Sequence, residues 1–203
     1  MMEILSTVEP APMESVEQPQ EEGRPARPST RELLPTGARR IVVAAVGAAL
    51  MVASLAAFGF TGRGLVGAVL CPVLVVLAAI DFEHRILPND IIGPAVLAIG
   101  LIIAAADAGS FLTHLAAGAA LGGFFLAFAL IFRGSLGLGD AKLGFLLGLA
   151  LGASTFAAVL IAFAGLLVNA LWILARQGFD ARGKAIAFGP YLALGGILAF
   201  FFG

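Results

Sequence analysis

From Ile41 to the end of the sequence, long apolar stretches follow one another with only short polar interruptions. A helix needs about 20 apolar residues, within a range of about 17–25, to cross a bilayer. These stretches predict an all-α protein, a polytopic membrane bundle of about seven transmembrane helices. We expect the helices at residues 41–60, 64–80, 90–107, 113–132, 141–154, 156–175 and 187–202, with the boundary at residues 152–154 the least clearly marked.

The composition agrees with an integral membrane protein. Of the 203 residues, 60% are hydrophobic and 12% are charged, whereas a soluble domain is typically about a quarter charged. The single cysteine, Cys71, permits neither an internal disulfide nor a zinc site built from cysteines. The net charge of −1 argues against nucleic acid as a partner. We therefore expect the lipid bilayer as the surroundings, and no bound metal or cofactor.

Residues 1–38 have a different composition, rich in glutamate and proline. Such a segment cannot bury enough apolar surface to offset the loss of chain entropy on folding. We expect a disordered tail over residues 1–38 and a single membrane domain over residues 39–203.

Lysine and arginine predict the orientation of the bundle, because cytoplasmic loops are enriched in both. With the N-terminus in the cytoplasm and seven alternating spans, eleven of the twelve basic residues fall on the cytoplasmic side, and Arg63 alone falls on the other. The segments at residues 81–89 and 133–140 then both face the cytoplasm. Glycines at four-residue spacing predict faces where helices pack closely: Gly118, Gly122, Gly144, Gly148 and Gly152.

Two aspartates stand at the predicted edge of the membrane, and each admits a simple explanation. Asp140 lies in GLGDAKL between two apolar stretches, and it could cap the following helix. Asp81 follows Ile80, where we expect the second span to end. An anion at a helix C-terminus is disfavoured by the helix dipole, so Asp81 is either an ordinary interfacial charge or a functional group.

The predicted topology places both aspartates on one face of the membrane. Two neighbouring carboxylates cannot both ionise easily, so such a pair can share one proton. The protonated member can polarise a scissile carbonyl while the ionised member takes a proton from water. The pair is therefore suited to hydrolysis without a covalent intermediate, although the individual roles cannot be assigned.

Three segments resemble the motifs of the prepilin peptidases. DFEHRILPND at residues 81–90 is similar to the first motif of that family, and IAFGPYLALGG at residues 186–196 is similar to its C-terminal motif. GLGDAKL at residues 137–143 resembles the second, whose Gly-x-Gly-Asp core is shared with preflagellin peptidases and presenilin-like proteases. The motifs follow the family's order and cover most of the membrane domain.

The resemblance implies a membrane-embedded aspartic endopeptidase. It would remove the short basic leader peptide of type IV pilin-like precursors at the cytoplasmic face of a bacterial inner membrane. The family's catalytic aspartates map onto Asp81 and Asp140. The residues that would bind the substrate or shape the site are Pro88, Asn89, Gly137, Gly139, Lys142, Phe188, Gly189 and Pro190.

The sequence departs from the family pattern in three places. It has no CxxC motif, whereas larger members carry paired CxxC motifs that bind zinc. We therefore predict no zinc, and methylation of the new pilin N-terminus, which many members perform, stays open. Asn89 stands where Asp is frequent, and Ala187 stands where Pro is usual.

Two other functional classes compete with the peptidase. An ion-coupled transporter uses intramembrane acids as carriers, but it would favour acids near the bilayer midplane and inverted repeats, neither of which the sequence indicates. A non-catalytic assembly factor of a pilus or secretion machine would need neither aspartate. The identity of the pilin substrate and the oligomeric state are left open.

Overall fold

The computed structural model describes residues 29–132, 137–177 and 187–203. Over these residues the chain is helical and contains no strand, which confirms the predicted helical membrane bundle. The helices are α1 (Thr30–Leu33), α2 (Gly37–Phe58), α3 (Gly62–His84), α4 (Asn89–Ala106), α5 (Ala108–Ile131), α6 (Leu138–Leu151), η1 (Gly152–Ser154), α7 (Thr155–Gln177) and α8 (Gly189–Phe202).

Five stretches of the described residues are long and apolar enough to cross a membrane: Gly37–Phe58, Gly62–His84, Asn89–Ala106, Ala108–Ile131 and Leu138–Arg176. The last contains α6 and α7, which meet at η1. The backbone of Gly152 has φ +55° there, a conformation that interrupts an α-helix and suits glycine. The break between the fifth and sixth helices therefore lies where the sequence placed it. The remaining apolar helix, α8, has 14 residues.

The predicted end of the second span at Ile80 is wrong by four residues. Helix α3 continues to His84 and ends at Arg85, whose backbone is left-handed with φ 54°. The polar side chains after Ile80 lower the hydropathy but leave the backbone hydrogen bonds of the helix intact, and the Arg85 N–H still bonds to the Asp81 carbonyl. Asp81 therefore lies in the last turn of α3.

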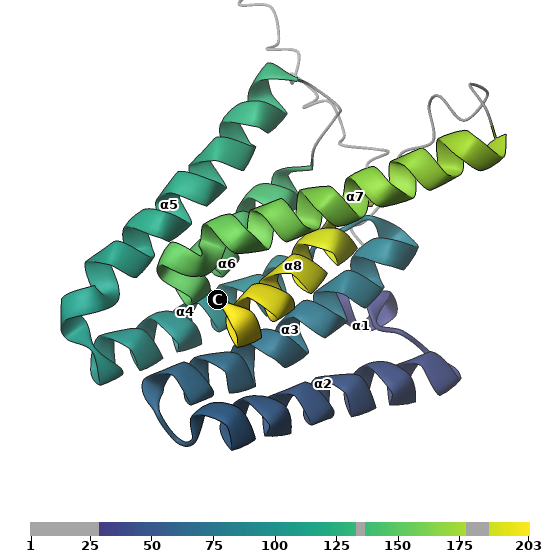
Figure 1. The fold of residues 1–203 in the computed structure, drawn as a ribbon. Helices are drawn as coiled ribbons and strands as arrows, with labels where there is room; N and C mark the ends of the chain where they lie inside the picture. The colour runs from purple at the N-terminus through teal and green to yellow at the C-terminus, as the bar shows by residue number, and fades with distance from the viewer. Residues whose placement is uncertain (1–28, 133–136, 178–186) are drawn as a thin grey trace, which may run out of the picture.

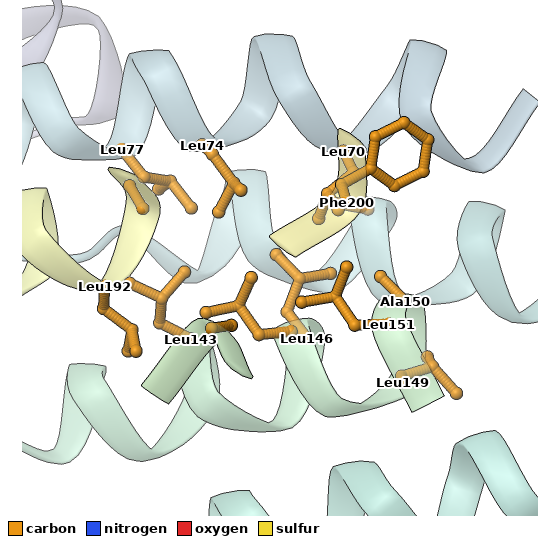
Figure 2. Packing of buried hydrophobic residues seen from close by; sticks show 14 of the residues in the cluster. Leu70, Leu74, Leu77, Leu143, Leu146, Leu149, Ala150, Leu151, Leu192 and Phe200 are labelled. Atoms are coloured by element: carbon orange, nitrogen blue, oxygen red, sulfur yellow. The ribbon is translucent and has the colours of Figure 1, made fainter. Parts of the chain in front are cut away.

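The helices pack side by side in the order α2, α3, α8 and α7 (Figure 1). Helix α6 contacts α4, α5 and α8, and so it joins this row to the remaining helices. Figure 2 shows buried side chains of α3, α6 and α8 meeting in the core; Leu74, Leu143 and Leu192 are fully buried. The core thus holds together the helices that carry the three motifs.

Helices α5 and α6 approach each other through the predicted glycine faces. A β-carbon on Gly148 would lie 2.5 Å from the Ala117 carbonyl oxygen, and one on Gly122 would lie 2.9 Å from the Phe145 β-carbon. On Gly144, a β-carbon would lie 2.6 Å from the Phe125 ring. Backbones at this distance gain dispersion contacts, which hold helices together where lipid provides no hydrophobic driving force.

Residues 29–38, the last part of the tail that we expected to be disordered, are among the described residues. Residues 1–28 of the predicted tail lie outside the described part of the chain. Helix α1 follows Ser29, whose N–H donates a hydrogen bond to the Glu32 carboxylate at 3.2 Å. Leu33 is buried, and Thr30 donates a hydrogen bond to Asp90 at the start of α4. Local capping and one buried leucine therefore give structure to residues that the composition alone would leave disordered.

Candidate active site

The two aspartates and the third motif meet at one end of the bundle. Asp81 lies in the last turn of α3, Asp140 in the first turn of α6, and Gly189 at the start of α8. The start of α4, at Asn89, joins the same region through a hydrogen bond from Lys142 of α6. Four helix ends from three separate parts of the sequence thus converge.

Asp81 is buried, with 6% of its surface exposed. Its Oδ2 accepts a hydrogen bond of 3.0 Å from the Gly189 backbone N–H. A β-carbon at position 189 would lie only 2.5 Å from the same oxygen. Only glycine therefore allows the start of α8 to approach this closely, and its N–H fixes the carboxylate.

Asp140 is buried to a similar degree, at 8% exposure. It is the third residue of α6, and its Oδ2 accepts a hydrogen bond of 3.1 Å from the Gly137 N–H. The sequence suggested that Asp140 could cap the following helix, and it does so, but not from the N-cap position. Gly137 is the N-cap residue, and Asp140 bonds back to it from inside the first turn. The positive end of the helix dipole favours a carboxylate at this position.

The two carboxylates lie near enough to interact electrostatically. Each uses Oδ2 for its backbone hydrogen bond, so its Oδ1 has no partner among the described residues. No fully enclosed side-chain oxygen or nitrogen in the described part of the chain lacks a partner, so both Oδ1 atoms remain accessible. Two fixed carboxylates with accessible oxygens can hold a water molecule and move protons.

Lys142 and Asn89 connect the segments that follow the two aspartates. The Lys142 Nζ donates a hydrogen bond of 2.6 Å to the Asn89 Oδ1. Pro88 is the N-cap residue of α4. Gly139 packs against Leu87, and a β-carbon at position 139 would lie only 2.9 Å from the Leu87 β-carbon. The site therefore has no room for a larger residue. These contacts bring the first and second motifs together.

Phe188 and Pro190 flank the glycine that holds Asp81. The Phe188 ring is buried against Phe125 of α5 and Phe163 of α7, with ring centroids 5.6 Å and 5.5 Å apart. Pro190 lies in the first turn of α8, a position that tolerates the missing N–H of proline. Aromatic packing on both sides therefore fixes the start of α8.

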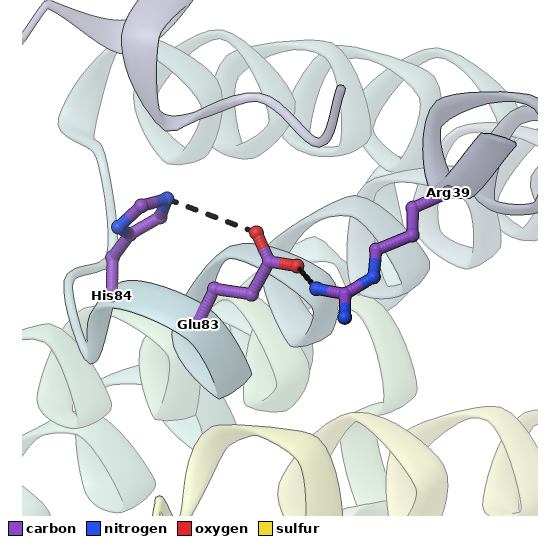
Figure 3. Close-up of polar contacts among 3 residues, drawn as sticks. All are labelled: Arg39, Glu83 and His84. Carbon is purple, nitrogen blue, oxygen red and sulfur yellow. Dashed lines mark hydrogen bonds and ion pairs between the residues drawn. The ribbon is translucent and has the colours of Figure 1, made fainter. Parts of the chain in front are cut away.

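A charged cluster beside the site was not anticipated. The Glu83 carboxylate pairs with Arg39 of α2, and His84 lies 3.9 Å away (Figure 3). Arg39 and Glu83 are 44 positions apart, and no short-range pattern signals their contact. Within the described residues no three His, Cys, Asp or Glu side chains form a possible metal site.

Comparison with known proteins gives a consistent family. Residues 68–174 match the model of the type IV leader peptidase family. The chain is 34% identical over 179 residues to a prepilin leader peptidase/N-methyltransferase of Burkholderia pseudomallei, covering 83% of this chain and 56% of that protein. Proteins of the same description from Xanthomonas campestris and Bacillus subtilis are 32% and 33% identical.

These alignments cover 76% and 78% of this chain, and 55% and 64% of the Xanthomonas and Bacillus proteins. The chain thus spans little more than half the length of the curated relatives it matches. No solved structure matches it significantly.

Proposed function

We propose, from the fact that the chain belongs to the type IV leader peptidase family, that it is a membrane-embedded aspartic endopeptidase. Its substrates are type IV pilin-like precursors, whose leader peptide it removes. The observation that carries the proposal is the convergence of Asp81 and Asp140, both buried and each fixed by one backbone N–H. The membrane domain over residues 39–203 is the catalytic unit.

Hydrolysis proceeds by general acid and base catalysis with a water held between the carboxylates. The pair carries one proton. The ionised carboxylate takes a proton from water, whose oxygen attacks the scissile carbonyl, and the protonated carboxyl donates a hydrogen bond to the carbonyl oxygen. The tetrahedral intermediate collapses as a proton passes to the leaving amine. The Gly189 and Gly137 N–H groups keep both carboxylates in place and leave their Oδ1 atoms for water and substrate.

The remaining motif residues shape the site rather than react. Lys142 and Asn89 hold the starts of α6 and α4 together. The Gly137 N–H holds Asp140, Gly139 allows close packing against Leu87, and Pro88 is the N-cap residue of α4. Phe188 and Pro190 set the position of Gly189.

Cleavage takes place at the cytoplasmic face of a bacterial inner membrane, with the N-terminus on that side. This orientation rests on the distribution of lysine and arginine, eleven of which fall on one side. The relatives' names include N-methyltransferase, but the proposal is confined to the peptidase step.

The test is co-expression with a prepilin-like precursor, comparing the wild type with Asp81→Asn and Asp140→Asn. We expect each variant to lower the cleavage rate by at least about 100-fold, since a general acid or base contributes about 10²–10⁴-fold. Precursor size on a gel and the mass of the pilin N-terminus are the readouts.

Glu32→Gln, which removes an exposed carboxylate charge in α1 and keeps an oxygen for the Ser29 N–H, is the control and should cleave normally. Membrane levels of all variants must be equal. Cleavage at the wild-type rate by either aspartate variant would contradict the two-carboxylate mechanism. Absence of cleavage by the wild type on every precursor tried would favour the transporter or assembly reading.

A further inference from the structure

A cavity of about 380 Å³ opens at the end of the bundle opposite to the aspartates. It lies where α3 and α5 begin and where α4, α6 and α8 end. Its polar lining consists of Arg63, Asp107, Ser110, His114 and Ser154, above an apolar floor that includes Val66 and Ile103. Arg63 and Asp81 are 18 residues apart on one helix, about 27 Å, so the cavity is distinct from the candidate active site.

Arg63 is held in place by the end of α8. Its Nη2 donates hydrogen bonds to the Phe200 and Gly203 carbonyl oxygens at 2.8 Å and 3.1 Å. The guanidinium also lies over the Phe58 ring, 4.2 Å from its centroid. Its Nε and Nη1 have no partner among the described residues and remain free to donate. A preorganised guanidinium of this kind suits a phosphate.

Two hydrogen-bond acceptors line the other part of the cavity. Asp107 uses Oδ1 to accept from the Gly109 and Ser110 N–H groups, and its Oδ2 has no partner among the described residues. The His114 Nδ1 lies 2.8 Å from the Leu149 carbonyl oxygen. A carbonyl can only accept, so Nδ1 carries a proton, and Nε2 is the ring nitrogen that can accept a hydrogen bond.

The cavity therefore favours a ligand with an anionic group and a separate group rich in N–H donors. The depth of the cavity in the membrane narrows the choice of ligand. Helix α3 has 23 residues and is about 34 Å long, which matches the hydrocarbon thickness of a bilayer of about 30 Å. The cavity at its end thus lies at the depth of the lipid headgroups, and its apolar floor can receive the first part of a lipid chain.

We propose that this cavity binds the headgroup of an aminophospholipid, with the phosphate at Arg63 and the primary ammonium at Asp107 and His114. Phosphatidylethanolamine has this chemistry. Phosphatidylcholine has the same phosphate and the same net charge, but its trimethylammonium group has no N–H to donate. The two lipids therefore differ in the feature that Asp107 and His114 recognise.

The test uses the full chain in detergent with added phosphatidylethanolamine or phosphatidylcholine of identical acyl chains. Bound lipid is measured by native mass spectrometry, and the midpoint of thermal unfolding is measured in parallel. We expect phosphatidylethanolamine to bind about tenfold more tightly, as one or two charge-assisted hydrogen bonds allow, and to raise the midpoint further.

Asp107→Asn is the decisive variant, because the asparagine oxygen keeps the helix cap while the unpaired Oδ2 is replaced by an NH2 group, which removes the charge and the second acceptor. It should reduce the preference for phosphatidylethanolamine, with His114 as the remaining acceptor, and Arg63→Gln should weaken the binding of both lipids. Asp90→Asn and Arg176→Gln, which lie outside the cavity, should leave the preference unchanged. These readouts do not involve cleavage, so the lipid site and the peptidase can fail independently.

Equal affinity of the wild type for the two lipids would overturn the proposal, as would a preference in Asp107→Asn as large as that of the wild type. Soluble glycerophosphoethanolamine is the third probe. If it competes as strongly as the intact lipid binds, the cavity takes a soluble phosphate ester and the lipid assignment is wrong.

Discussion

The backbone N–H of Gly189 bonds to the Asp81 Oδ2 at 3.0 Å, although the two residues are 108 positions apart. This bond joins the first turn of α8 to the last turn of α3. The position of α8, which is fixed by Phe188 between Phe125 and Phe163, therefore determines how Asp81 is held. Gly189 is a positioning residue in the proposed reaction, and the third motif acts through it.

Gly189→Ala should impair cleavage severely. Its β-carbon would lie 2.5 Å from the Asp81 Oδ2, so the carboxylate or the start of α8 must move. A displacement of about 1 Å can cost about 100-fold in rate, and we expect a loss of this order in kcat with a smaller change in KM. The measurement is steady-state cleavage of a purified precursor.

Gly93→Ala is the matched control for this substitution. Gly93 lies in α4, and a β-carbon there meets no atom within 4 Å. Its activity should equal that of the wild type. Normal kcat in Gly189→Ala would mean that the backbone contact to Asp81 has no part in catalysis.

Lys142→Met should lower kcat/KM by about three- to tenfold. The Lys142 hydrogen bond to Asn89 is exposed, so its value falls below the about 1.5–3 kcal/mol typical of a charged partner. Its loss frees the start of α6 from the start of α4. The same cleavage assay, carried out at several precursor concentrations, measures the effect.

Asn89→Asp tests the contact between Lys142 and Asn89 by changing the acceptor instead of the donor. An aspartate keeps an oxygen opposite Lys142 and adds a charge, so activity should be retained in the wild-type background. Combined with Lys142→Met, the added charge has no cation opposite it, and activity should fall below that of Lys142→Met alone. Loss of activity in Asn89→Asp alone would show that the neutral acceptor is required.

Hydropathy predicted the helices because the cost of polar groups in lipid is large and depends only on the local sequence. The break at Gly152, which has φ +55°, was predicted from a short Gly-Ala-Ser segment, which is also a local signal in the sequence. Hydropathy failed at the end of α3, where Asp81 and Glu83 lower the local value while the helix continues to His84. The end of α3 is set by its backbone hydrogen bonds and by the left-handed backbone of Arg85, and the composition reveals neither.

The contacts within the candidate site were beyond prediction from spacing. The distribution of lysine and arginine predicted that Asp81 and Asp140 lie on one side of the membrane, but Asn89 and Lys142 were named as site residues without a contact between them. The pairing of Gly189 with Asp81 depends on α3 and α8 lying side by side, a tertiary relationship that no local pattern encodes.

Gly148→Ala should destabilise the bundle. Its β-carbon would lie 2.5 Å from the Ala117 carbonyl oxygen, and a backbone atom cannot move aside as a flexible side chain can. Overpacking of this kind costs about 1–3 kcal/mol. Thermal unfolding in detergent should show a lower midpoint. Gly123→Ala, where a β-carbon meets nothing within 4 Å, should be neutral or stabilising, since alanine favours helix by about 0.8–1.0 kcal/mol.

Glu83→Gln should have little effect, although Glu83 is only two residues from Asp81. Its partner Arg39 has 75% of its side chain exposed, and an exposed ion pair contributes about 0–1 kcal/mol. We expect a stability loss below about 1 kcal/mol that shrinks further at high salt, with cleavage close to that of the wild type. Unfolding and cleavage measured at low and high salt check both expectations. Abolished cleavage in a stable Glu83→Gln protein would instead place Glu83 in the reacting site, next to the two aspartates.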